Sequence, residues 1–229
     1  VKAHFHEDDH HFPPTTLVEI ENTYNMGGGL CWEHEQLRAV IQQANDLGMG
    51  VMMDGARLWN AAAATGKSEA EIAAGVDAVT VCMSKGLGAP VGSLLAGSKE
   101  LIHRAHRVRK MLGGGMRQAG ILAAAGLYAL DHHRERLGDD HDNARFLADG
   151  IATIDGVRLA TEGVDTNILI VDVDESMGTA ADLQAACADR GLLFWPTQAQ
   201  QFRWVTHLDV SRADCERALQ ILSEVCAGR

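Results

Sequence analysis

The stretch VDAVTVCMSKGLGAPVGS at residues 76–93 decides the fold of this chain. Its first half reads as a strand, and its second half places Lys85 in a loop of glycines and small residues. An earlier strand-like run, GVMM at residues 50–53, leads into Asp54. A loop lysine with such neighbours is typical of a reactive amine, and pyridoxal phosphate binds as a lysine Schiff base while a carboxylate pairs with its ring nitrogen. Lys85 and Asp54 together therefore predict an enzyme that uses pyridoxal 5'-phosphate.

Size, charge and cysteine content narrow the class of protein. The 229 residues can bury a large core, and no apolar run is long enough to cross a bilayer. A net charge of −11 disfavours nucleic acid and anionic membranes as partners. The five cysteines show no metal-ligand spacing and the first residues show no signal pattern. These features predict a reducing compartment, with the cytoplasm as the default.

Strand and helix patterns alternate along the first half of the chain, which is typical of a parallel α/β sheet. Strands are expected at residues 17–22, 51–53, 76–83 and 93–96, and helices at 33–46, 58–64 and 68–74. Residues 99–149 read as mostly helical, with a break at glycines 113–115 and a long helix from near Arg117. Further strands are expected at 167–173, 192–195 and 202–207, and further helices at 179–189 and from Ser211, an N-cap with Asp214 at the third helical position.

This order of elements predicts an α/β fold with two domains. Residues 1–130 would form a large domain with a mainly parallel sheet, and residues 131–229 a connecting helix and a small C-terminal α/β domain. In open α/β sheets ligands bind at the carboxyl ends of the strands, and Asp54 and Lys85 both follow such ends.

Five stretches of the chain match one family in order. They are ENTYN at 21–25, DGARLWNA at 54–61, SKGLGAPVGS at 84–93, RKMLGGGMRQ at 109–118 and RWVTHLDVS at 203–211. Together they resemble the low-specificity L-threonine aldolases, which have the aspartate-aminotransferase-like fold (fold type I) of pyridoxal-phosphate enzymes. The resemblance implies cleavage of threonine or allo-threonine to glycine and an aldehyde by a homodimer or homotetramer. The family's N-terminal segment, with its phosphate-cradling turn and a ring-stacking histidine, has no counterpart, so the large domain is expected to be incomplete and a missing N-terminal piece is a further expected partner.

The resemblance implies roles for five residues. Lys85 would form the internal aldimine, and Asp54 would pair with the pyridinium nitrogen. Arg57 would contact the cofactor or the substrate carboxylate, and Arg203 would anchor that carboxylate, a task that suits a bidentate guanidinium. His11 would lie near the substrate hydroxyl, where histidine or a water could act as the base.

Two further motifs have weaker implications. Lys110 and Arg117 flank the glycine run at 113–115 and could bind the cofactor phosphate, possibly that of a neighbouring subunit, although a structural turn is an equal alternative. Thr23 and Asn25 belong to a string in which Tyr24 replaces the family's histidine, and they are expected to serve local turn chemistry.

Three alternatives to the aldolase hypothesis remain open. A β-eliminating lyase of the same fold would release pyruvate and ammonia in place of glycine and an aldehyde. A non-catalytic remnant would keep the fold without the phosphate cradle. A metal-dependent hydrolase would require His4, His6, His10 and His11 to converge, but their spacing fits no specific site, so no metal is expected.

Overall fold

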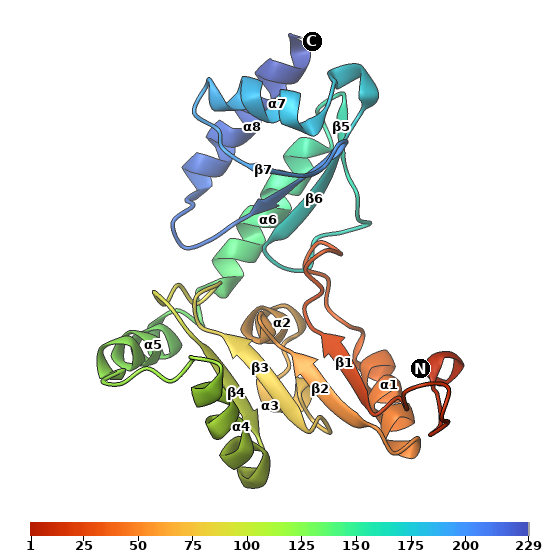
Figure 1. The fold of residues 1–229 in the computed structure, drawn as a ribbon. Coiled ribbons are helices and arrows are strands. Elements are labelled where there is room, and N and C mark those ends of the chain that lie inside the picture. Colours follow the sequence, from red (N-terminus) through yellow and green to blue (C-terminus); the bar gives the residue numbers. More distant parts are fainter. Residues whose placement is uncertain (229) are drawn as a thin grey trace. The chain divides into compact units, whose positions relative to one another are not determined.

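The structure is a computed structural model that describes residues 1–228 (Figure 1). Its contacts divide the chain into two compact units. The first comprises residues 1–23 and 32–134, and the second comprises residues 24–31 and 135–229. The second unit thus includes a short segment, Tyr24–Cys31, that comes soon after the first strand in sequence.

The first unit is built on a four-stranded sheet in the order β1-β2-β3-β4. The strands are β1 (Leu17–Glu21), β2 (Gly50–Asp54), β3 (Ala78–Cys82) and β4 (Ser93–Gly97). The first three are parallel, and β4 pairs antiparallel with β3. In register, Glu21 lies opposite Asp54 and Asp54 opposite Thr80, so β1, β2 and β3 end at one edge of the sheet.

Helices connect and flank these strands (Figure 1). They are η1 (Lys2–His4), α1 (His34–Asp46), α2 (Leu58–Thr65), α3 (Glu69–Ile72), α4 (Lys99–Met111) and α5 (Gly120–His132). α1 shows why its sequence forms a helix: the Glu33 side chain accepts a hydrogen bond from the Gln36 N–H at its beginning, and Leu37, Ile41 and Ala44 form one buried stripe.

The second unit contains an antiparallel sheet in the order β5-β6-β8-β7. Its elements are α6 (Leu137–Ile151), β5 (Val157–Leu159), β6 (Ile168–Val173), η2 (Glu175–Met177), α7 (Ala180–Ala188), β7 (Trp195–Gln198), β8 (Gln201–Val205) and α8 (Arg212–Ala227). Apolar side chains of β6, β8, α6, α7 and α8 form its core, with Phe202 and Leu222 fully buried. Ser211 caps α8 and Asp214 returns the capping-box hydrogen bond, which confirms the predicted start of that helix.

The start of α5, the position of β7 and the presence of β5 differ from the sequence prediction, and the short helices η1 and η2 were not predicted. The helix expected near Arg117 begins at Gly120, because Gln118 adopts a left-handed φ of 49° that an α-helix cannot contain. The strand expected at 192–195 is found at Trp195–Gln198, where pairing with β8 begins at Arg203. β5 was not predicted, since three residues are too few to show a period.

The predicted fold class is confirmed: a mainly parallel α/β sheet is accompanied by a second sheet with helices. Within residues 1–228, every helix is too short or too polar to traverse a lipid bilayer.

Candidate active site

Lys85 lies in a tight loop that follows β3. The Gly88 N–H donates to the Lys85 carbonyl oxygen at 2.8 Å, and the Ala89 N–H donates to the Met83 carbonyl oxygen at 3.0 Å. Gly88 has a φ of +68°, a conformation that favours glycine. Leu87 in this loop is buried and Lys85 is half-buried, so the lysine belongs to a hydrogen-bonded turn that packs against the rest of the unit.

Asp54 is the last residue of β2, the strand next to β3. Its Oδ1 accepts a hydrogen bond from the Ala56 N–H at 2.9 Å, which turns the chain sharply out of the sheet. The turn is close-packed: a Cβ on Gly55 would lie 2.9 Å from the Thr80 carbonyl oxygen. Asp54 is half-buried, and its second carboxylate oxygen is not used by the bond to Ala56.

Arg57 follows Asp54 by three residues and stands immediately before α2, where it is half-buried. Because β2 and β3 are parallel neighbours, the structure brings Asp54, Arg57 and the Lys85 loop to the same edge of the same unit. A primary amine, a carboxylate and a guanidinium at one sheet edge are the groups that a Schiff-base cofactor with a basic ring nitrogen and a phosphate requires. The residues present therefore fit pyridoxal phosphate.

Helix α5 supports the Lys85 loop through a contact that the sequence did not predict. His133 Nδ1 lies 2.6 Å from the Leu87 carbonyl oxygen. A carbonyl can only accept, so Nδ1 carries the hydrogen in this contact. No local sequence signal marks His133, because its partner lies 46 positions away.

His11 lies in the loop that precedes β1, and thus on the amino-terminal side of that strand. Its ring packs on His10, and its Nδ1 lies 3.0 Å from Asp9 Oδ1. In the part of the chain that the structure describes, these contacts do not join His11 to Asp54 or Lys85. Asp9, His10 and His11 offer three ligand atoms within 4.8 Å of one another, but all three residues are exposed.

Lys110 and Arg117 are exposed. Lys110 belongs to the last turn of α4, and Arg117 lies between α4 and α5. The Gly113 N–H donates to the Lys110 carbonyl oxygen at 3.2 Å, so the glycine run forms a turn that ends α4. Their expected role at the phosphate stays a prediction.

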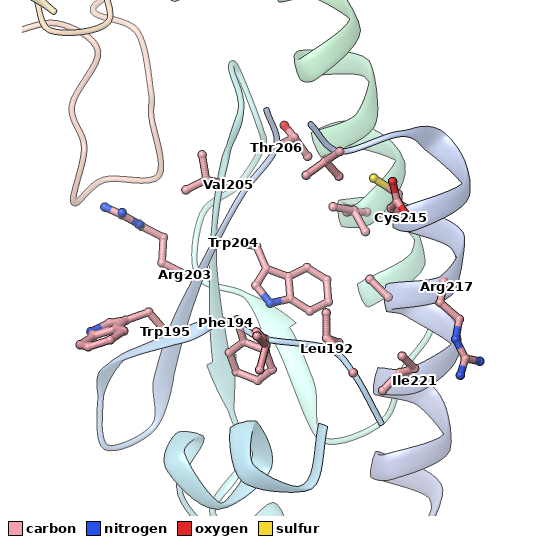
Figure 2. Close-up of a pocket in the computed structure, with 16 residues that line it drawn as sticks. Leu192, Phe194, Trp195, Arg203, Trp204, Val205, Thr206, Cys215, Arg217 and Ile221 are labelled. Atoms are coloured by element: carbon pink, nitrogen blue, oxygen red, sulfur yellow. The ribbon is translucent and has the colours of Figure 1, made fainter. Parts of the chain in front are cut away.

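Arg203 belongs to the second unit, on β8. Figure 2 shows its side chain pointing away from α8, whereas the neighbouring Trp204 points toward that helix. Arg203 Nη1 donates a hydrogen bond of 2.8 Å to Asn25 Oδ1. Asn25 was expected to serve turn chemistry alone, and the 178 positions between it and Arg203 gave the sequence no means of linking them.

A cavity of about 490 Å³ opens between β8 and α8 (Figure 2). Phe194, Trp204, Ala218 and Ile221 line it, and Arg203 contributes to its rim. Thr206, Asp214 and Arg217 add polar and charged groups to this otherwise apolar lining, and the Arg203 side chain is directed away from α8.

Comparison with known proteins is consistent with this arrangement. The model of the family described as beta-eliminating lyase matches residues 1–176. The low specificity L-threonine aldolase of Escherichia coli K12 is 45% identical over 207 residues, which are 90% of this chain and 59% of that protein. The low-specificity L-threonine aldolase 1 of Arabidopsis thaliana is 38% identical over 214 residues, 93% of this chain and 60% of that protein.

The chain thus spans about 60% of the length of the curated relatives it matches. Among solved structures, the threonine aldolase of Leishmania major superposes with a TM-score of 0.77 at 20% identity, covering 96% of this chain and 64% of the other. That likeness shows the fold. The resemblance drawn from the five sequence motifs is confirmed by these relatives.

Proposed function

This chain belongs to the beta-eliminating lyase family, and we propose that it acts in the pyridoxal-phosphate-dependent cleavage of L-threonine or L-allo-threonine to glycine and an aldehyde. The observation that carries the proposal is the placement of Asp54 and the Lys85 loop after adjacent parallel strands. The names of the relatives support the substrate class, since both are low-specificity L-threonine aldolases.

Each of the predicted site residues has its own role in binding the cofactor. Lys85 would hold the cofactor covalently through its amine, and Asp54 would pair with the ring nitrogen and keep it protonated. Arg57 binds the phosphate or the substrate carboxylate, and Lys110 and Arg117 are further candidates for the phosphate. When bound, pyridoxal phosphate supplies the electron sink that stabilises the negative charge left at Cα.

Two further side chains, Arg203 and His11, would act on the substrate. Arg203 holds the α-carboxylate through its planar guanidinium. A base takes the proton of the β-hydroxyl, and His11 or a water beside it fills this role. The Cα–Cβ bond breaks, the aldehyde leaves, and a proton returned to Cα completes glycine.

We test this proposal by trapping the cofactor on the chain. The protein is incubated with pyridoxal phosphate, reduced with borohydride, digested and examined by mass spectrometry. We expect the pyridoxyl mass on Lys85, its loss in Lys85→Ala and its retention in Lys99→Ala, a change at an exposed lysine of α4. Adduct on other lysines in equal amount would contradict the assignment of Lys85.

Product analysis separates the two reactions that this fold supports. With threonine we expect glycine and acetaldehyde in equal amounts. Pyruvate or another 2-oxo acid together with ammonia would show β-elimination, the reaction for which the family is named.

In Asp54→Asn the rate of threonine cleavage should fall by roughly 10²-fold, the cost typical of losing one group that stabilises charge in the transition state.

The proposal also covers the oligomeric state, the domain boundaries and the cellular location of the protein. A homodimer or homotetramer is supported by the resemblance and is tested by sedimentation of the cofactor-loaded protein. Two domains at 1–130 and 131–229 are supported by the change of contact unit near Arg134. A cytoplasmic location is supported by the five cysteines, none of which forms a disulfide among the described residues.

A further inference from the structure

The side chain of Arg203 is oriented by a neutral partner. Its Nη1 donates to Asn25 Oδ1 at 2.8 Å in a partly buried contact. On β8, Arg203 lies between Ile170 of β6 and Trp195 of β7, so its backbone is fixed by pairing on both sides. The side-chain bond to Asn25 adds the constraint that the strand alone does not provide.

Asn25 is itself held in place by the Tyr24–Cys31 segment. Within it, the Gly28 N–H donates to the Asn25 carbonyl oxygen at 3.3 Å, and the Tyr24 N–H donates to the Leu30 carbonyl oxygen at 3.0 Å. This turn fixes the position from which the Asn25 side chain projects.

Two contacts fasten the segment to the rest of the second unit. The buried Thr166 hydroxyl donates to the Gly29 carbonyl oxygen at 2.7 Å. The Cys31 N–H donates to the Asp165 carboxylate at 2.8 Å. A side chain on so firmly attached a turn can hold a partner in one orientation.

The charge of Arg203 is not neutralised by this contact. Among residues 1–228, carboxylates form ion pairs with other arginines of the second unit, such as Arg136 with Asp140 and Arg158 with Asp172, but none pairs with Arg203. An amide oxygen accepts one N–H of the guanidinium and carries no charge, so the other donors and the full positive charge remain for an anion. A carboxylate in place of the amide would compete with that anion.

We propose that Asn25 is a positioning residue, which orients Arg203 for the α-carboxylate of the substrate while leaving its charge unpaired. The inference rests on the proposed function, because it takes the anion to be that carboxylate. It assigns a specific task to the Asn25 side chain, in addition to the turn hydrogen bond that the Asn25 backbone carbonyl accepts from the Gly28 N–H.

The test compares a carboxylate ligand with its uncharged analogue on the cofactor-loaded protein. Dissociation constants are measured for glycine and for glycinamide in the parent, Asn25→Asp, Asn25→Ala and Arg203→Met. The Asn25→Asp change keeps the shape and adds a negative charge. We expect it to weaken glycine binding about tenfold or more, because the new carboxylate would pair with the Arg203 guanidinium and compete with the carboxylate of glycine. Glycinamide has no carboxylate, so its binding should be unchanged.

Asn25→Ala removes the orienting bond without adding charge, so we expect a smaller loss for glycine, by about threefold to tenfold. Asn45→Asp is the matched control, because it adds the same charge on the exposed side of α1. In the Asn25 variants KM for threonine should rise with kcat nearly unchanged. A structural defect alone would change both constants and both ligands.

The outcomes separate the inference from the proposed function. If Arg203→Met leaves the ratio of glycine to glycinamide affinity unchanged, Arg203 is not the carboxylate anchor and that part of the proposed function fails. If Arg203→Met lowers the ratio but both Asn25 variants match the parent, the positioning role is overturned. Nitrogen-15 NMR of Arg203 on the cofactor-free protein gives a second measurement: guanidinium rotation should be faster in Asn25→Ala, and an unchanged rotation rate would also overturn the inference.

Discussion

His133 holds Leu87 through a hydrogen bond of 2.6 Å between its Nδ1 and the Leu87 carbonyl oxygen, and so connects the end of α5 to the loop that carries Lys85. Leu87 is almost fully buried, with 1% of its surface exposed, so its carbonyl would have little access to water if the imidazole were removed. The position of the Lys85 loop thus depends on a contact with the C-terminal end of α5.

We predict that His133→Ala destabilises the first unit by ~1–3 kcal/mol, the cost of leaving a buried acceptor unsatisfied. Urea denaturation measures this change in the free energy of unfolding. His132→Ala is the control, because the exposed His132 meets Tyr128 of its own helix, through Nδ1 at the carbonyl oxygen and by ring stacking, and neither contact involves the Lys85 loop. Equal effects of the two substitutions would show that the Leu87 contact contributes nothing.

Gly29 fixes the attachment of the Tyr24–Cys31 segment. Its φ is +71°, and a Cβ there would overlap the Thr166 hydroxyl and lie 3.1 Å from Ile168 Cβ. Gly48 has the same φ but nothing within 4 Å of the Cβ position. Comparing alanine substitutions at the two glycines therefore separates the steric cost of the Cβ from the cost of the positive φ. We predict that Gly29→Ala costs ~1–3 kcal/mol more than Gly48→Ala in thermal or urea unfolding. A difference near zero would mean that the segment is not fastened as described.

Arg136 and Asp140 form a two-point ion pair in which the aspartate side chain is fully buried. Removing the arginine leaves a buried carboxylate without its countercharge, and we predict a loss of about 3 kcal/mol or more for Arg136→Met. In the same helix, Arg145 pairs with Asp142 at the surface, and Arg145→Met should cost less than ~1 kcal/mol. Comparable losses in the two variants would contradict the difference in burial.

His141 gives the second unit a dependence on pH. Burial, with a smaller contribution from the nearby Arg145, lowers the pKa of His141 below its usual value of 6.5. The unfolded chain then binds the proton at a higher pH than the folded chain does. Stability is therefore complete above about pH 6.5 and falls as the pH drops toward the folded pKa.

The measurement is the free energy of unfolding at about pH 7.5 and about pH 5.5, compared between the parent and His141→Gln. We expect the loss of stability on acidification to be smaller in the variant, while the exposed His132→Gln should behave like the parent. An acid-induced loss that is the same in all three proteins would rule out His141 as its source.

The reactivity of the Cys31 thiol tests whether the Tyr24–Cys31 segment is packed as described. Burial, followed by the nearby Asp165 carboxylate, raises the pKa of the Cys31 thiol to about 12. The thiolate is the nucleophile, so we predict slow alkylation of Cys31 by iodoacetamide at neutral pH and fast alkylation once the protein is unfolded. Asp165→Asn keeps a hydrogen-bond acceptor for the Cys31 N–H, removes the charge and should speed the reaction modestly. Immediate labelling of Cys31 in the folded parent would contradict its burial.

Much of the fold could be read from local patterns. The stripe of Leu37, Ile41 and Ala44 predicted α1, and alternating apolar runs predicted β1, β2 and β3 to within one or two residues. Asp54 and Lys85 were predicted as site residues because they stand at or just after the ends of such runs, and the structure places them there. Periods of 2 and 3.6 residues and capping motifs act over a few neighbours, so a single sequence contains them.

Other features were decided only by packing between distant positions. The sequence assigned Asn25 to a turn and gave no sign that its side chain meets Arg203, or that His133 meets Leu87. It also placed a strand at 192–195, whereas β7 is located by pairing with β8 from Trp195 onward.

The chain by itself therefore determined the alternation of elements and placed Asp54 and Lys85, the residues proposed to bind the cofactor, after adjacent strands. The tertiary structure decided which groups orient them, because hydrogen bonds between residues 46 or 178 positions apart depend on how whole elements pack and leave no local spacing to detect.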